Sequence, residues 1–222
     1  MIPLSACHKP QDGNPHWERV VLQLPFDGAD GSTTITDVSP APLTCTAYAD
    51  AQLDTALKPF GNSSLLLDGT GDYVGIASFP ALGTGNFTIE TFIYSTSYSE
   101  LDGVLDFRPG GNGAYALLYT SGGILRFYVN TVDRIVSAAL PTSAWNHIAV
   151  CRNKGVSTLF VNGAVSGTPW TDATNYLSAA TAYIGKTFDN YYFAGNIGPV
   201  RVTTAALYTT AFDVPAAAFL TS

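Results

Sequence analysis

The sequence predicts an all-β fold, a two-sheet antiparallel β-sandwich of the jelly-roll type. Two observations lead to this prediction. Many short apolar segments are separated by turn residues at short intervals, and the chain holds 21 Gly, 13 Pro, 12 Tyr and 12 Phe but a single Met, a composition typical of pleated sheets joined by tight turns. No long segment has the 3.6-residue periodicity of an amphipathic helix.

The composition favours one folded domain. Of the 222 residues, 46% are hydrophobic and 12% are charged, which is enough apolar material for a sizeable core. Residues 1–18 mix Pro, Gly, His and Trp without periodicity, so we expect an N-terminal arm there. No change of composition marks a second domain, and we expect residues 19–222 to form the sandwich.

Charge and patterning exclude several partners. The formal net charge is -7 and the pI is near 4.6, so there is no basic surface for nucleic acid. No apolar run approaches the ~20 residues that cross a bilayer, which predicts no membrane insertion. Residues 1–17 lack the apolar region of a signal peptide.

The three cysteines, Cys7, Cys45 and Cys151, are far apart and have no metal-ligand spacing, so a structural zinc site is not expected. Cys151 lies in an apolar run and is expected to be a small buried side chain. A Cys7–Cys45 disulfide stays open, although a chain made in a reducing cytosol would keep both as thiols.

The elements follow in order along the chain. Residues 19–24 are a predicted strand, residues 25–31 a turn-rich loop, and residues 64–74 a strand, turn and strand. Residues 86–94 alternate with a period of two, as a half-buried strand does. Further predicted strands are residues 103–107, 115–119, 124–129, 145–152, 182–185, 192–197 and 199–203.

The strongest local signal is Asn162-Gly163 between two apolar runs, which predicts a β-hairpin within residues 157–167. A Pro- and Ala-rich tail spans residues 207–222. Phe87 and Trp145 are expected to fill the space between the sheets because large side chains on strands pack there.

Five segments in sequence order resemble the laminin G-like, concanavalin A-like lectin/glucanase domain found in bacteriophage virion proteins. They are residues 24–34, 60–74, 85–94, 145–150 with 159–163, and 183–185 with 193–203. The resemblance implies two curved antiparallel sheets packed face to face, with edge loops that often carry carbohydrate or a calcium ion.

The resemblance makes calcium a candidate cofactor. Its ligands would be carboxylates in two Gly-rich loops, namely Asp27, Asp30, Asp68 and Asp72. Asp also favours turns before Gly without any metal, so the turn explanation stands beside the metal explanation. Related sequences often carry acidic residues where this chain has Gly198-Pro199.

A sugar-binding surface would need exposed aromatic faces with polar neighbours. The candidates are Trp170, Asn175, Tyr176, Asp189, Asn190, Tyr191 and Tyr192. The alternative is that a chain with this much tyrosine exposes some of it without a ligand.

No catalytic residue is predicted, and we expect a protein that is not an enzyme. Glu90 and Asp106 are the conceivable glycosidase pair. Glu90 lacks the second acid two positions away that retaining glucanases of the resembled fold have, and its strand face could simply be solvated. His147 has no nucleophile or acid in a recognisable motif and is expected to be a structural residue.

The resemblance implies a virion structural or decoration protein on the surface of a phage particle, at the capsid or the tail. Its partners would be other virion proteins or a host-surface glycan, and a homo-oligomer suits such a component. Two alternatives stay open: a stand-alone carbohydrate-binding lectin or adhesin module, and a glycan-cleaving enzyme.

Overall fold

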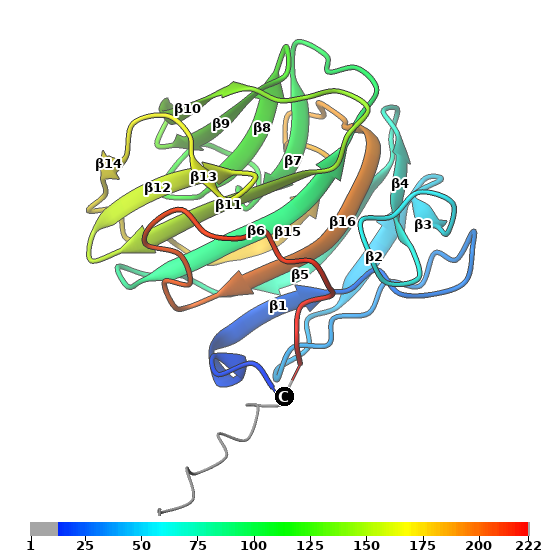
Figure 1. The fold of residues 1–222 in the computed structure, drawn as a ribbon, viewed down its shortest axis with the longest axis horizontal. Coiled ribbons are helices and arrows are strands. Elements are labelled where there is room, and N and C mark those ends of the chain that lie inside the picture. The colour runs from blue at the N-terminus through cyan, green and yellow to red at the C-terminus, as the bar shows by residue number, and fades with distance from the viewer. Residues whose placement is uncertain (1–12, 222) are drawn as a thin grey trace, which may run out of the picture.

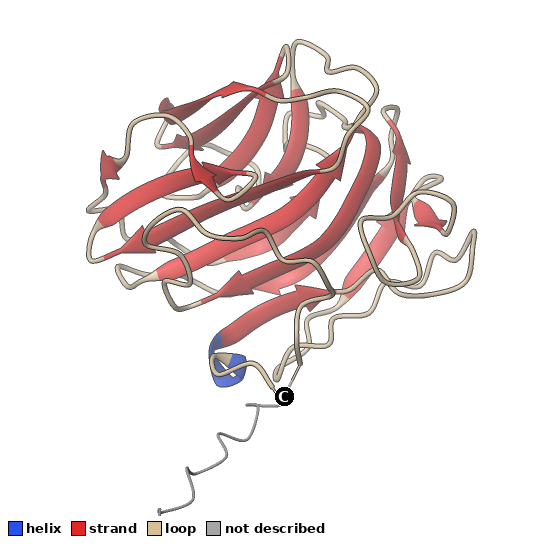
Figure 2. Cartoon of the chain, viewed as in Figure 1, coloured by secondary structure: helices blue, strands red, loops and turns tan. Residues whose placement is uncertain are grey.

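The computed structural model describes residues 13–221 and forms two antiparallel sheets packed face to face (Figures 1 and 2). The predicted all-β sandwich is confirmed. Most of the predicted arm, together with Cys7, lies outside the described residues. Trp17–Arg19 form a short 3-10 helix, η1, that leads into the first strand. No helix in the described part of the chain is long and apolar enough to cross a membrane.

The first sheet is built around the longest strands. Its order is β13 (Ala164–Val165), β12 (Val156–Val161), β11 (Asn146–Asn153), β6 (Phe87–Tyr94), β16 (Ala194–Thr203), β4 (Ser64–Asp68) and β3 (Gln52–Asp54). Two further strands attach to it: β1 (Val20–Leu24) pairs with β16, and β14 (Trp170–Thr171) pairs with β12.

The second sheet has seven strands. Its order is β10 (Val132–Ala139), β9 (Ile124–Val129), β8 (Leu117–Ser121), β7 (Asp102–Asp106), β15 (Ala179–Ile184), β5 (Tyr73–Phe79) and β2 (Cys45–Tyr48). Strands that are distant in sequence therefore lie side by side, because β15 runs between β7 and β5.

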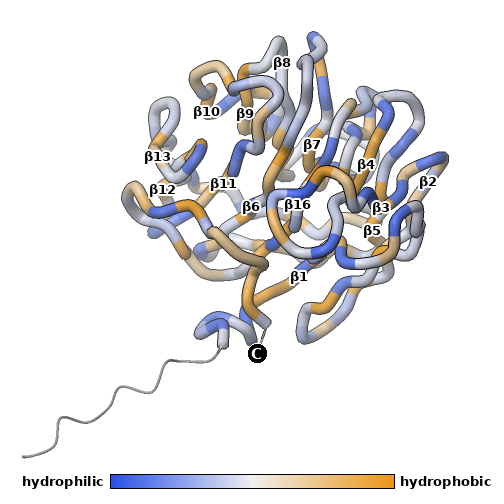
Figure 3. The backbone as a smooth tube through the Cα atoms, turned by 45° about the vertical axis from the view of Figure 1, so that its right-hand side comes forward, coloured by the Kyte–Doolittle hydropathy of each residue, from blue (hydrophilic) through white to orange (hydrophobic). Residues whose placement is uncertain are grey.

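The core fills the space between the two sheets. Strand β6 supplies Phe87, Ile89 and Ile93, and strand β9 supplies Leu125 and Phe127, all fully buried. The period of two in a pleated strand places these residues on one face, and Figure 3 shows apolar residues interleaved with polar ones along the chain. Burial of each such side chain contributes about 1.5–3 kcal/mol.

The expectation for Phe87 is confirmed and the one for Trp145 is wrong. Phe87 is buried in the core, where its ring meets that of Tyr176 at a centroid distance of 5.1 Å. Trp145 precedes β11, is half-buried, and packs against Tyr94 at 5.6 Å. Tyr94 alternates with the core residue Ile93, so this contact lies outside the space between the sheets.

The predicted hairpin is confirmed at Asn162-Gly163. Both residues have positive φ, +50° and +76°, as a tight turn between β12 and β13 requires. A Cβ on Gly163 would overlap the carbonyl of Phe212, and the Phe212 amide donates to the Gly163 carbonyl at 2.9 Å. The hairpin therefore also holds the C-terminal segment in place.

That C-terminal segment, residues 204–221, crosses the outer face of the first sheet (red in Figure 1). A second, small apolar cluster forms beneath it, where Ala149, Cys151 and Phe160 of the sheet meet Tyr208 and Phe212 of the segment. The Tyr208 and Phe212 rings stack at 3.6 Å. The outer face of the first sheet is thus largely covered by the chain itself.

Candidate functional site

The outer face of the second sheet carries a row of aromatic and polar side chains. The strand register places Tyr128 of β9 opposite Leu117 of β8, Leu117 opposite Asp106 of β7, and Asp106 opposite Tyr183 of β15. Residues paired in this way lie on the same face of a sheet, with strands about 4.8 Å apart. The row therefore runs across four neighbouring strands.

The loop of residues 185–193 lies over this face between β15 and β16. The Gly103 amide donates to the Tyr191 carbonyl at 3.3 Å, and the Phe188 amide donates to Asp106 Oδ2 at 2.9 Å. A Cβ on Gly103 would overlap the backbone of Lys186 and Thr187. Glycine at this position is what allows the loop to lie directly against β7.

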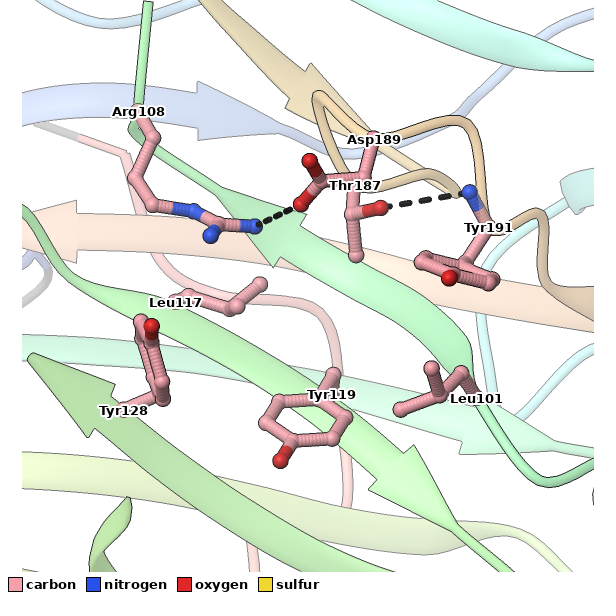
Figure 4. A pocket seen from close by; sticks show the side chains of 8 residues that line it. All are labelled: Leu101, Arg108, Leu117, Tyr119, Tyr128, Thr187, Asp189 and Tyr191. Carbon is pink, nitrogen blue, oxygen red and sulfur yellow. Dashed lines mark hydrogen bonds and ion pairs between the residues drawn. The ribbon is translucent and has the colours of Figure 1, made fainter. Parts of the chain in front are cut away.

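A pocket opens on one side of this loop (Figure 4), with a volume of about 140 Å³. That volume is close to the ~150 Å³ of a cavity that holds one benzene ring. We call it the tyrosine pocket; it is lined by Leu101, Arg108, Leu117, Tyr119, Tyr128, Thr187, Asp189 and Tyr191. Tyr191 is 46% exposed, so its ring is accessible from solvent.

Arg108 is held rigidly at the wall of the pocket. Its Nε and Nη2 donate to the Asp106 carboxylate at 2.9 and 2.7 Å, and both side chains are almost completely buried. Nη1 donates to Asn112 Oδ1 at 2.9 Å. Nη2 also lies 3.5 Å from the half-exposed carboxylate of Asp189. The Arg108 guanidinium packs 4.3 Å from the Phe188 ring centroid, which fixes its plane further.

Tyr119 and Tyr128, which form the floor of the tyrosine pocket on strands β8 and β9, have hydroxyls oriented by neighbouring acceptors. Tyr119 donates to Asp133 Oδ1 at 2.9 Å, and Tyr128 donates to Asn112 Oδ1 at 3.2 Å. Burial, together with the bond to Asp133, raises the pKa of Tyr119 to about 12. The Tyr119 hydroxyl is therefore protonated throughout the physiological range.

On the other side of the loop, Lys186 lies among tyrosines. Its Nζ is 4.2 Å from the ring centroid of Tyr73, 4.6 Å from that of Tyr183 and 5.9 Å from that of Tyr192. Burial lowers the pKa of Lys186, and the charge of Asp106 partly opposes this. The Tyr73 ring stacks on that of Tyr48 at 4.4 Å. These contacts anchor the base of the loop to β5 and β15.

Four of the predicted sugar-binding residues lie on this loop. Asp189 and Tyr191 line the tyrosine pocket. Asn190 Oδ1 accepts a hydrogen bond from Lys186 Nζ at 3.1 Å, and Tyr192 lies beside the same ammonium group. The sequence prediction thus included two residues of the pocket, both on the loop, and none from the sheet beneath it.

The other three predicted residues lie elsewhere. Tyr176 is 2% exposed, and its hydroxyl donates to the buried Asp172 at 2.8 Å. The expectation that its ring is exposed and can stack on a sugar is therefore wrong. Trp170 is half-buried, with the Arg134 guanidinium 4.8 Å from its ring. Asn175 is exposed next to Tyr176.

Sequence reasoning missed six pocket residues, namely Leu101, Arg108, Leu117, Tyr119, Tyr128 and Thr187. A weak signal was present, because Tyr119 and Tyr128 alternate with apolar core residues in their strands and so must point outward. Nothing local in the sequence places these strands under the loop of residues 185–193.

The four aspartates proposed for calcium accept hydrogen bonds in turns and loops, as Asp68 does from the Thr70 amide at 2.6 Å. Asp72 accepts from the backbone amides of Asp50 and Asp68 at 2.8 and 3.0 Å. Asp30 accepts from Thr55, and Asp27 accepts from the Asn62 side chain. Among residues 13–221, no group of three or more His, Cys, Asp or Glu side chains is arranged to hold a metal ion.

Glu90 and Asp106 do not face each other across a cleft. Glu90 lies on β6 of the first sheet and Asp106 on β7 of the second. The expectation that Glu90 faces solvent is wrong, because it is fully buried beneath the C-terminal segment. Its carboxylate accepts hydrogen bonds from Arg201 Nε at 2.8 Å, Tyr208 at 2.8 Å and His147 Nε2 at 3.1 Å.

Comparison with known proteins adds the family. A family model described as the concanavalin A-like lectin/glucanases superfamily matches residues 68–210, nearly two thirds of the chain. A search of curated proteins found no significant match.

Solved structures share the fold. Domain 4 of AbnA, a GH43 extracellular arabinanase from Geobacillus stearothermophilus solved with arabinotriose, has a TM-score of 0.64 at 15% identity over 86% of this chain and 94% of that one. The botulinum neurotoxin serotype G binding domain gives 0.62 at 12% identity over 85% of this chain and 48% of that one. The binding domain of botulinum neurotoxin DC, solved in complex with SialylT, gives 0.62 at 13% identity over 86% and 49%. The chain spans about half the length of these neurotoxin domains.

Proposed function

Because the chain belongs to the concanavalin A-like lectin/glucanase superfamily, we propose that it is a non-catalytic, lectin-like protein that contacts saccharide through the tyrosine pocket. The observation that carries this proposal is the combination of three tyrosine rings, two leucines, the fixed Arg108 and the half-exposed Asp189 around a pocket of about 140 Å³. A concave, mostly apolar site with a few oriented polar groups is the usual form of a small-ligand site.

The chemistry of a pyranose or furanose ring suits this lining. The C–H face of a sugar packs on aromatic rings, and its hydroxyls need acceptors and donors in fixed positions. Tyr119, Tyr128 and Tyr191 supply rings, and Asp189 supplies carboxylate oxygens at the exposed edge. Two of the similar structures were solved with arabinotriose and with SialylT, which supports a saccharide as the ligand class.

We further propose that the protein is a structural or decoration component of a phage particle, located at the capsid or tail surface. The five segments that resemble phage virion domains support this placement. Its partners would be neighbouring virion proteins and a glycan of the host surface. Mass spectrometry of purified particles tests the placement: we expect the chain among the particle proteins, and its absence from them would contradict this part of the proposal.

A stand-alone lectin or adhesin is the second candidate, since the same pocket would serve it. Glycan binding without association with particles would favour it. A glycan-cleaving enzyme is less well supported because Glu90 and Asp106 lie in different sheets, where each accepts a hydrogen bond from a buried side chain, His147 and Arg108. Release of reducing sugar by the wild-type chain would favour the enzyme.

The pocket is tested with a matched pair of substitutions. Tyr191→Ala removes a half-exposed ring, and we expect glycan affinity to fall at least about tenfold, which corresponds to about 1.4 kcal/mol. Tyr191→Phe keeps the ring and is expected to bind within about threefold of wild type. Val165→Ala, at an exposed apolar residue of the first sheet, serves as the control. Equal affinity of Tyr191→Ala and wild type would refute the assignment.

A further inference from the structure

We infer that the tyrosine pocket selects neutral or amine-bearing saccharides and excludes acidic ones that carry carboxylate or sulfate groups. This inference rests on the proposed saccharide function and adds the ligand class. Most hydrogen-bond donors of the lining are already used by the protein itself.

The positive charge of the pocket is already paired. Arg108 directs its Nε and one Nη2 hydrogen to Asp106, which is fully buried, and one Nη1 hydrogen to Asn112. An arginine has five N–H donors, and the remaining Nη2 hydrogen faces Asp189 at 3.5 Å. A single Nη1 hydrogen is left for a ligand, which is too few for the two-pronged recognition of a carboxylate or sulfate.

The hydroxyls of the floor present lone pairs instead of hydrogens. Tyr119 and Tyr128 each have one O–H, and these are donated to Asp133 and Asn112. Neither hydroxyl hydrogen is therefore available to a ligand, and each oxygen retains only acceptor capacity. A ligand rich in hydroxyl or ammonium hydrogens can satisfy these oxygens, whereas an anion brings further acceptors that cannot.

The free charge of the lining is negative. Asp189 is 45% exposed, and among the described residues its carboxylate contacts no cation except Arg108, at 3.5 Å. Since Asp106 balances Arg108, Asp189 is the uncompensated charge among the residues that line the pocket, in a chain whose net charge is -7. Lys186 lies on the other side of the loop, where its Nζ donates to Asn190 Oδ1 at 3.1 Å. An anionic group in the pocket would lie well within one Debye length, about 8 Å at physiological salt, of Asp189.

Together these features combine attraction with exclusion. Asp189, Tyr119 and Tyr128 accept hydrogen bonds from vicinal hydroxyls, and the same groups repel a ligand carboxylate and leave it unsatisfied. Specificity commonly arises from such repulsive elements as well as from attractive contacts. We expect a ratio of at least tenfold in affinity between a neutral oligosaccharide and its acidic counterpart.

The test is a glycan array that pairs each neutral oligosaccharide with its sialylated and its sulfated form and includes oligomers of glucosamine with free amines. The wild-type chain is expected to bind members of the neutral or amine-bearing sets at least tenfold better than the acidic ones. In Asp189→Asn this ratio should fall to about threefold or less. Asp213→Asn removes the same charge from an exposed residue of the C-terminal segment and should leave the ratio unchanged.

A second measurement uses the unmodified protein. Raising NaCl from 50 to 500 mM screens Asp189, so the wild-type ratio should narrow, with little change in the affinity for neutral glycans. This readout does not depend on the folding of any variant.

The outcomes separate the two proposals. Binding that is lost in Tyr191→Ala but favours sialylated or sulfated glycans would overturn this inference and leave the proposed saccharide function in place. If neither Tyr191→Ala nor Asp189→Asn changed glycan affinity, both the inference and the proposed function of the pocket would be overturned, because the site would lie elsewhere. Failure of the folded protein to bind any saccharide on the array would also overturn both.

Discussion

Replacing Glu90 with glutamine is expected to destabilise the sandwich strongly, although the side chain keeps its size. Glu90 is fully buried and is the shared acceptor for Arg201, Tyr208 and His147. A neutral amide would leave the Arg201 guanidinium, of which only 11% is exposed, without a counter-charge. Breaking a buried ion pair by neutralising one partner costs about 3–5 kcal/mol.

The local geometry offers little compensation. The glutamine oxygen can still accept from Arg201, but its NH₂ group then faces the donors of Tyr208 and His147. His147 could adopt the tautomer that carries its proton on Nδ1 instead of Nε2. However, Nδ1 is buried and has no hydrogen-bond partner, and the imidazole ring packs against the rings of Phe92 and Phe212. An orphaned buried donor adds about 1–3 kcal/mol, so we expect the loss to be at least about 3 kcal/mol.

The pH dependence of the stability difference between wild type and Glu90→Gln provides an independent test. Burial alone would raise the pKa of Glu90, but the His147 hydrogen bond, the Arg201 charge and the Tyr208 hydrogen bond outweigh it, and the net shift is downward. A carboxyl whose pKa is lower in the folded state contributes stability that is complete above its unfolded pKa of about 4.3 and is lost as the pH falls through the folded value. The advantage of wild type over Glu90→Gln should therefore shrink from pH 7 to pH 3.

The assay is urea unfolding at pH 7 and at pH 3, with Tyr208→Phe as the control. That variant removes one donor and leaves the carboxylate paired, so its cost should be about 1.5–3 kcal/mol at pH 7, below that of Glu90→Gln. A free energy of unfolding for Glu90→Gln within about 1 kcal/mol of wild type, or a gap that is the same at both pH values, would refute the reasoning.

Three further outcomes are expected. Gly103→Ala places a methyl group against the backbone of the loop at Lys186 and Thr187, so it should cost about 1–3 kcal/mol in urea unfolding and weaken glycan binding; unchanged binding would show that the loop position does not matter to the pocket. Phe212→Ala removes the ring that stacks on Tyr208, and limited proteolysis should then cleave the C-terminal segment faster; an unchanged cleavage rate would contradict the packing described above. Adding 10 mM CaCl₂ should leave the thermal midpoint unchanged, whereas a site with a dissociation constant near 10⁻⁴ M would add about 2.7 kcal/mol of stability.

Much of the sheet structure could be predicted because apolar and polar residues alternate within single strands. Residues 86–94 form β6 almost to the residue, and Asn162-Gly163 turns where expected. Strand β10 escaped prediction because it is an edge strand whose outward residues include Val132 and Val136, both about 40% exposed. Exposed valines blur the contrast between the two faces of a strand, and that contrast is the signal on which strand prediction depends.

The site could be predicted only where its chemistry was local. A loop with Asp189, Asn190, Tyr191 and Tyr192 has a composition suited to sugar contact, and it lies at the pocket. The pairing of β8 and β9 with β7 depends on contacts between distant segments, which no single segment specifies. Tyr176 shows the converse, because its neighbours suggest a loop, whereas Asp172 and Phe87 hold it in the interior.

The two outer faces of the sandwich differ in a way that bears on function. Glu90 and Phe160 on the first sheet are covered when the chain leaves β16 and returns across that sheet as residues 204–221. Among residues 13–221, no such segment covers Tyr48 of the second sheet and Tyr191 of the loop that lies over it, which are 44% and 46% exposed. Aromatic rings that are exposed on one sheet, while the chain covers those of the other, are consistent with the ligand surface proposed above. The loop of residues 185–193, fixed by Gly103 and Asp106, gives that surface a definite shape before any ligand arrives, and such preorganisation lowers the entropy cost of binding.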